Sequence, residues 1–358
     1  MDLICNQVLY GVPVPQSAIP RLLDLASKLA PGSVNVLIDN EDAFLKFNER
    51  LILNRNIVQI GVFIKIDTGY NRAGIKTSSP HFRDLVETVV SRTSKHGPFL
   101  RGFYSHFGHS YAGSSEEDAA NGLIEELLGL EQAFSVVPST YTQELVLSVG
   151  ATPTATAAQN MLNASSSPRV KEFQDVLARL QRSHRVELHA GVYPLLDCQQ
   201  VATHARPSDA QASEAFQPLS KHNIAIKMLV EVTSVYDERA KPEALVSAGS
   251  LAMGREPCKS YPGWGILTPD LGNSDTSLIY DERGEKTGWI VGRVSQEHGI
   301  LTWEGAREKC NPLTVGDKVM IWPNHACVAG AGFGWYLIVD SEKGGDTVVD
   351  VWVRWRGW

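Results

Sequence analysis

Several features that are scarce or missing in this 358-residue sequence narrow the kind of protein it encodes. No run approaches the roughly 20 consecutive apolar residues that a membrane-spanning helix needs, so we expect no membrane partner. Basic residues form no cluster and the net charge is −7, which argues against a nucleic-acid-binding surface. The first residues also lack the basic and then apolar layout of a secretory signal.

Cysteine is the next scarce residue. The five cysteines are odd in number and widely scattered, which is typical of free thiols in a reducing compartment and not of a disulfide framework. Together with the missing signal, this predicts a cytoplasmic protein. Its 43% hydrophobic and 20% charged residues are ordinary for a soluble globular protein, and its length suggests about two domains.

The first part of the chain, residues 1–220, alternates short apolar runs with amphipathic helical patterns. The runs expected to be strands are Leu3–Val8, Val34–Asp39, Val58–Ile66, Leu100–Ser105, Glu144–Val149 and Arg185–His189. Near-continuous apolar runs are typical of parallel strands covered on both faces. This repeat predicts a β/α barrel or a doubly wound sheet, although the six units are two fewer than a closed barrel requires.

After about Asn223 the pattern changes to β-like runs separated by turn signals. These runs are Ile224–Val235, Ser277–Tyr280, Trp289–Ser295, Lys318–Trp322, Gly334–Val339 and Thr347–Trp355. Because no long amphipathic helix interrupts them, residues 221–358 are expected to form an antiparallel β domain. The polar stretch 203–217 is a plausible connector between the two domains.

Polar, glycine-containing segments follow four of the expected parallel strands. They are residues 67–74, 106–111, 150–154 and 190–193. Each segment alone reads as an ordinary β/α turn. Because the carboxyl ends of barrel strands lie on one rim, the four together favour a functional site there.

A His-x-Cys pair, His325 and Cys327, lies between two of the β-like runs. Imidazole and thiolate both suit zinc, and on extended backbone an i, i+2 pair points to one face. Two protein ligands are too few for a closed structural site but suffice for an open one. Burial of both residues in a core is the alternative.

Five segments in order make the chain resemble the D-serine dehydratase and D-threonine aldolase family of fold-type III pyridoxal-phosphate enzymes. They are residues 65–74, 148–154, 187–193, 295–299 and 323–327. The resemblance covers nearly the whole chain. It implies an alanine racemase-like barrel, here without its first two β/α units, followed by a β domain.

The resemblance also implies residue roles, with pyridoxal phosphate and zinc as cofactors. Cofactor contacts would come from Arg72 at the pyridine ring or its 3-hydroxyl, Thr152 and Thr154 at the phosphate, and Gly191, Val192 and Tyr193 around the phosphate cup. His325 and Cys327 would hold the zinc, and His-x-Cys resembles the dehydratase branch. Val192 and Ser247 stand where the family commonly has Asn and Asp.

One family feature has no counterpart: the segment that carries the Schiff-base lysine on the first barrel strand. No catalytic lysine is therefore identified, and Lys65 is at best a substitute. A truncated gene model, a splice product and a degenerate copy all remain open.

The resemblance implies a lyase that converts D-serine to pyruvate and ammonia by β-elimination, and a homodimer if the barrel is complete. The alternatives are a non-catalytic protein that binds the cofactor and metal, and a D-threonine aldolase or D-3-hydroxyaspartate lyase on the same scaffold. The expected small-molecule partner is a D-amino acid in each case.

Overall fold

The computed structural model describes residues 7–54, 58–163, 168–206, 217–268 and 279–354. The chain forms two compact units, Met1–Ala190 and Gly191–Trp358. The boundary expected at residue 220 lies inside the second unit. Residues 191–206 belong there because Val192, Cys198 and Val201 pack in the core of that unit with Ile266 and Trp322.

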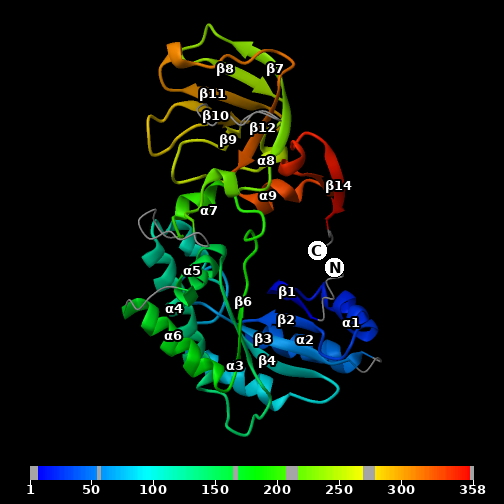
Figure 1. The fold of residues 1–358 in the computed structure, drawn as a ribbon. Helices are drawn as coiled ribbons and strands as arrows, with labels where there is room; N and C mark the ends of the chain where they lie inside the picture. The colour runs from blue at the N-terminus through cyan, green and yellow to red at the C-terminus, as the bar shows by residue number, and fades with distance from the viewer. Residues whose placement is uncertain (1–6, 55–57, 164–167, 207–216, 269–278, 355–358) are drawn as a thin grey trace. The chain divides into compact units, whose positions relative to one another are not determined.

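A six-stranded parallel sheet with the order β1-β2-β3-β4-β5-β6 organises the first unit (Figure 1). Its strands are β1 (Val8–Pro13), β2 (Val34–Ile38), β3 (Ile60–Ile66), β4 (Pro98–Ser105), β5 (Val146–Val149) and β6 (Arg185–Leu188). The strand expected at Leu3–Val8 begins only at Val8, and residues 1–6 lie outside the described part. Every residue of β2 and β3 is buried, as expected for central parallel strands covered on both faces. The sheet is open, with β1 and β6 at its edges.

Six helices lie between these strands, one after each of β1 to β4 and two after β5: α1 (Ile19–Lys28), α2 (Glu41–Leu53), α3 (Pro80–Ser91), α4 (Glu116–Phe134), α5 (Thr152–Asn163) and α6 (Pro168–Gln181). The Ser115 hydroxyl caps α4 by accepting a hydrogen bond from the Asp118 N–H. The long helix α4 packs on β4 and β5, so its inner face lies behind the strand ends that carry the polar segments.

The second unit contains a closed antiparallel barrel with the strand order β10-β11-β8-β7-β12-β9. Its strands are β7 (Met228–Tyr236), β8 (Glu243–Val246), β9 (Gly265–Thr268), β10 (Gly288–Val294), β11 (Gly299–Glu304) and β12 (Lys318–Pro323). The sequence patterns missed β8, β9 and β11. The strand expected at Ser277–Tyr280 is absent at Ile279 and Tyr280, and its other residues lie outside the described part. Trp289 and Trp303 pack edge to face in the barrel core.

Short helices and a hairpin complete this unit. They are α7 (Cys198–Thr203), α8 (Ser250–Met253), α9 (Ala326–Ala331), β13 (Trp335–Val339) and β14 (Val348–Val353). Single 3-10 turns occur at Gly108–Ala112 in the first unit and at Lys221–Asn223, Arg307–Lys309 and Ser341–Lys343 in the second. Among the residues that the structure describes, none of the helices has the length and apolar character needed to cross a bilayer.

Candidate functional site

A buried amine lies at the carboxyl end of the parallel sheet. Lys65, near the end of β3, is only 5% exposed, and its Nζ lies 4.7 Å from the centre of the Tyr104 ring on β4. Burial, and next the charge of Arg72, lower the pKa of Lys65 to about 8. An amine with this pKa is partly unprotonated near neutral pH, so it can accept a proton or attack a carbonyl group.

Three stacked rings lie next to this amine. The rings of Tyr104 and His189 are 4.2 Å apart and nearly parallel, and the ring of His106 lies 5.8 Å from that of His189. Burial lowers the pKa of His106 to about 4 and that of His189 to about 3, with nearby positive groups adding to the effect. Both imidazoles are therefore neutral at physiological pH.

Hydrogen bonds select the tautomer of His189. Ser148 Oγ donates to Glu187 Oε1 over 3.0 Å, and it also lies 3.0 Å from His189 Nδ1. Because the single hydroxyl proton goes to Glu187, Nδ1 must carry the ring proton and donate to Ser148. His189 Nε2 then keeps its lone pair. This atom is buried and has no hydrogen-bond partner within the described ranges, so it is ready to accept from a bound group.

The turn between β5 and α5 holds the two threonines expected at a phosphate. It begins at Gly150, whose φ of 138° and whose closeness to the His189 carbonyl exclude a side chain. Thr152 and Thr154 are both buried. The Thr154 hydroxyl accepts from the Ala151 N–H and lies 3.3 Å from Glu126 Oε2. It therefore faces inward, so direct phosphate binding by Thr154 would require its hydroxyl to turn and remains a prediction.

Arg72 lies in an exposed loop after β3. The Asp67 carboxylate shapes this loop by accepting hydrogen bonds from the N–H groups of Gly69 and Asn71. The guanidinium carbon of Arg72 lies 5.0 Å from the centre of the Tyr70 ring. Its charge acts on Lys65 and His106, as their lowered pKa values reflect, so the structure brings Arg72 to the same rim.

The other expected cofactor contacts, Gly191, Val192 and Tyr193, begin the second unit. The Val192 side chain is 1% exposed in the core, so only its backbone is open to a ligand. Tyr193 is exposed. A Cβ at Gly191 would lie 3.7 Å from Cys327 Sγ, which places Gly191 beside the expected metal pair.

His325 is held by two side chains at the start of α7. Its Nδ1 lies 2.7 Å from Gln199 Oε1 and 3.7 Å from Asp197 Oδ2. Because an amide oxygen only accepts, Nδ1 donates to Gln199 and the lone pair lies on Nε2, as a metal ligand requires. The buried Asp197 also accepts from the Ala326 N–H, which fixes the backbone between His325 and Cys327.

The backbone of the His-x-Cys pair differs from the extended form expected. His325 is extended, with φ −135° and ψ 113°, but it is the N-cap of α9, and Cys327 lies in the first turn of that helix. Cys327 as a whole residue is exposed, but its thiol is partly buried, and this burial raises the pKa of the thiol. In the ranges the structure describes, no three His, Cys, Asp or Glu side chains form a group that could hold a metal ion. The pair can supply two ligands.

Comparisons with known proteins match both units. A model of a putative serine dehydratase domain matches residues 225–339, and one of the N-terminal domain of alanine racemase matches residues 22–170. The D-serine dehydratase of Schizosaccharomyces pombe is 35% identical and that of Saccharomyces cerevisiae 34% identical. Each alignment covers 99% of this chain, and 74% and 75% of the respective relatives.

The chain belongs to the D-serine dehydratase family. Among solved structures, the D-threo-3-hydroxyaspartate dehydratase from Delftia sp. HT23 has a TM-score of 0.72 and 23% identity, over 99% of this chain and 80% of that one. An alanine racemase-like protein from Idiomarina loihiensis has the same score and identity, over 98% and 78%. These likenesses confirm the expected fold class, an alanine racemase-like α/β sheet followed by an antiparallel β domain.

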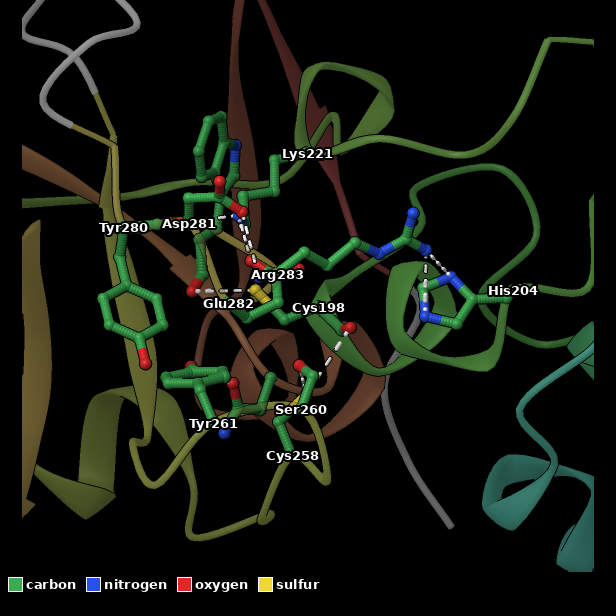
Figure 2. A network of polar contacts seen from close by, with 12 residues as sticks. Cys198, His204, Lys221, Cys258, Ser260, Tyr261, Tyr280, Asp281, Glu282 and Arg283 are labelled. Atoms are coloured by element: carbon green, nitrogen blue, oxygen red, sulfur yellow. Dashed lines mark hydrogen bonds and ion pairs between the residues drawn. The ribbon is translucent and has the colours of Figure 1, made fainter. Parts of the chain in front are cut away.

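A cavity of about 350 Å³ lies elsewhere in the second unit and was not expected from the sequence. Lys221 and Glu282 on its wall form an ion pair, and Lys221 Nζ also donates to the Tyr280 carbonyl over 2.6 Å. Figure 2 shows the Arg283 guanidinium reaching the ring of His204. Because these charged groups bind other residues of the same unit, we assign the cavity no role in the family reaction.

Sequence reasoning overlooked several residues that shape the sites, above all Glu126. It is 0% exposed on the inner face of α4, between Leu123 and Leu130, which are also fully buried. A carboxylate on an apolar helical stripe could have signalled it. Asp197 and Gln199 gave no such signal, because they approach His325 only through the fold.

Proposed function

We propose that the protein is a D-serine dehydratase, a lyase that converts D-serine to pyruvate and ammonia. The observation that carries this proposal is the 35% identity to a curated D-serine dehydratase over 99% of the chain. The two candidate sites support it, because one can hold an aromatic cofactor and the other a metal ion.

Pyridoxal phosphate is the cofactor that family membership implies, and the rim of the parallel sheet fits it. The orphaned Nε2 of His189 can accept from a bound ring, and α5 begins directly after the turn at Gly150, so its N-terminal backbone N–H groups suit a phosphate. The residues that would hold it are Arg72, Thr152, Thr154, Gly191, Val192 and Tyr193. When bound, this cofactor supplies an electron sink that acidifies the substrate Cα–H.

The chain's own residues then set the protonation states around the bound groups. Arg72 supplies positive charge at the rim, and His106 and His189 stay neutral, so they add no charge of their own. We propose that the rim holds the cofactor non-covalently, through the charge of Arg72 and the hydrogen-bonding side chains near it. Lys65 is the competing assignment, because its amine is buried and partly unprotonated near neutral pH.

Zinc is the metal that we propose for His325 and Cys327, because an imidazole and a thiolate match its preferences. When bound, zinc supplies a Lewis acid for the substrate's β-hydroxyl. Gln199 holds the Nδ1 proton, so that Nε2 of His325 is the ligand atom. One solved structure is a cysteine-to-alanine mutant of a D-threo-3-hydroxyaspartate dehydratase in a metal-free form, which is compatible with a metal site in that protein.

The test is a product assay on purified protein supplied with pyridoxal phosphate and zinc. Pyruvate formed from D-serine, and absent with L-serine, is the expected result. A folded protein that stays inactive on D-serine, D-threonine and D-3-hydroxyaspartate but binds both cofactors would replace the dehydratase with the non-catalytic alternative. Borohydride reduction and peptide mapping should find no pyridoxyl-lysine, and a label on Lys65 would overturn the non-covalent assignment.

A second candidate substrate, D-threo-3-hydroxyaspartate, is favoured by one observation. A curated D-threo-3-hydroxyaspartate dehydratase from Delftia sp. is 28% identical over 302 residues. Oxaloacetate formed faster than pyruvate at equal substrate concentrations would make this the main activity.

We also propose a cytoplasmic homodimer. Free thiols support the location, since all four cysteines in the described part, Cys198, Cys258, Cys310 and Cys327, are unpaired. Light scattering on the purified protein should give twice the chain mass of 39.2 kDa, and a single chain mass would refute the dimer.

A further inference from the structure

A fully buried carboxyl group lies behind the rim of the parallel sheet. Glu126 is 0% exposed on α4, and its carboxylate accepts hydrogen bonds from four groups, one of them the Phe107 N–H. Oε1 accepts from the Gly150 N–H and the Ser105 hydroxyl, each over 3.1 Å, and Oε2 accepts from the Thr154 hydroxyl over 3.3 Å. Burying a carboxyl group costs free energy unless hydrogen bonds within the protein replace those that it made with water.

These contacts join the ends of three consecutive strands. Ser105 ends β4, and its hydroxyl lies 2.8 Å from that of Thr68, which follows β3. Gly150 directly follows β5, and Thr154 lies in the first turn of α5. The donor directions in this network are consistent: Thr68 donates to Ser105, and Ser105 and Thr154 donate to Glu126. One carboxyl group therefore ties the three loops together.

The turn that Glu126 holds has little freedom of its own. Gly150 adopts φ 138°, and a Cβ there would lie 2.3 Å from the His189 carbonyl oxygen. The Gly150 N–H must therefore point in one direction, and Glu126 supplies its acceptor. The Ala151 N–H is likewise directed at Thr154 Oγ1, which Glu126 orients in turn.

We propose that Glu126 is a positioning residue whose carboxyl group fixes the turn between β5 and α5, and with it the N-terminal end of α5, to which we assign the binding of a phosphate monoester. This inference rests on the proposed function for its ligand, but its geometry stands on the hydrogen bonds alone. Burial raises the pKa of Glu126 to about 7. Its charge acts on two neighbouring titratable groups, Lys65 on β3 and Tyr104 on β4, and raises the pKa of each.

A protonated or amide side chain preserves the essential contacts. The oxygen Oε1 can still accept from Gly150 and Ser105, while the other atom donates to Thr154, which then donates to the Ala151 carbonyl 3.2 Å away. Glu126→Gln should therefore retain the turn, whereas Glu126→Ala leaves the Gly150 N–H without an acceptor. Rescue by glutamine separates hydrogen-bond positioning from a role of the charge.

The experiment measures binding of pyridoxal phosphate and of inorganic phosphate by calorimetry in the full chain. Glu126→Ala should weaken both at least tenfold, and Glu126→Gln less than threefold. Glu125→Ala, which removes the exposed neighbour on α4, is the matched control and should bind as wild type does. Equal weakening by alanine and glutamine, or unchanged binding in the folded alanine variant, would overturn the proposal.

A second measurement does not depend on any ligand. Hydrogen exchange of the peptide spanning residues 148–154 should be at least tenfold faster in Glu126→Ala than in wild type, and nearly unchanged in Glu126→Gln. If the alanine variant fails to fold, Ser105→Ala tests the same network and should speed exchange two- to fivefold. Should wild type bind neither ligand, the proposed function fails, while unchanged exchange in these variants would refute the positioning role.

Discussion

The two candidate sites differ in the environment of their polar side chains. At the rim of the parallel sheet, Lys65, His106, His189 and Glu126 all have pKa values shifted toward their neutral forms, and burial is the largest cause in each. In the second unit, His325 and Cys327 lie near the surface, and hydrogen bonds orient the His325 ring and the backbone between the two residues. The first region suits an organic cofactor, and the second suits an ion that brings additional ligands.

The largest expected effect is a loss of zinc affinity when one residue of the His-x-Cys pair in the second unit is replaced. His325→Ala or Cys327→Ala removes one of only two protein ligands, so the affinity for zinc should fall at least about 100-fold. Zinc content after dialysis, measured by atomic absorption, checks this. Cys310→Ala removes another free thiol of the same unit and should leave zinc content unchanged. Wild-type zinc content in both variants would make the pair a packing feature.

Much of this contrast could be predicted from the sequence, because it depends on local patterns. Apolar runs marked the central strands β2 and β3, and the ordered segments marked the rim and the His-x-Cys pair. The short strands β8 and β9 were missed because four residues carry little periodicity. The contacts of Glu126 with Gly150 and of Gln199 with His325 join residues 24 and 126 positions apart, so only the fold reveals them.

At the rim of the parallel sheet, we expect a substitution at Gly150 to reduce the free energy of unfolding the most. Gly150→Ala forces a side chain into a left-handed backbone and against the His189 carbonyl, so we expect a loss of about 3 kcal/mol in the free energy of unfolding. Urea denaturation measures it. Gly316→Ala is the matched control, because Gly316 also has a positive φ but faces open space, and it should lose only about 1 kcal/mol. Equal losses would mean that the close approach to His189 does not constrain the turn.

The pH dependence of stability sharpens the contrast further. The pKa of Glu126 is raised from 4.5 to about 7, so its protonated form favours folding, and this contribution is lost as pH rises from about 4.5 to 7. Wild type should therefore lose on the order of 3 kcal/mol relative to Glu126→Gln across that range. The lowered pKa values of His106 and His189 have the opposite effect, because their contribution to stability is lost as pH falls below 6.5. Both histidines are present in wild type and in Glu126→Gln, so their contributions cancel in the difference between the two proteins.

Denaturation at a series of pH values gives this difference directly. Glu125→Gln alters an exposed carboxyl on the same helix and should follow wild type at every pH. A difference between wild type and Glu126→Gln that stays constant from pH 4.5 to 7 would contradict the raised pKa.

The smallest expected effect comes from the neighbour of the metal pair. Gln199→Leu removes the acceptor of the His325 Nδ1 proton but leaves both ligands in place. The imidazole can then rotate or change tautomer, so zinc affinity should fall about tenfold, at the lower end of what such supporting contacts contribute. Competition with a zinc-binding dye measures this, and Gln181→Leu, an exposed glutamine at the end of α6, serves as the control. A loss as large as that of His325→Ala would mean that Gln199 is itself a ligand, and no loss would mean that Asp197 alone orients the ring.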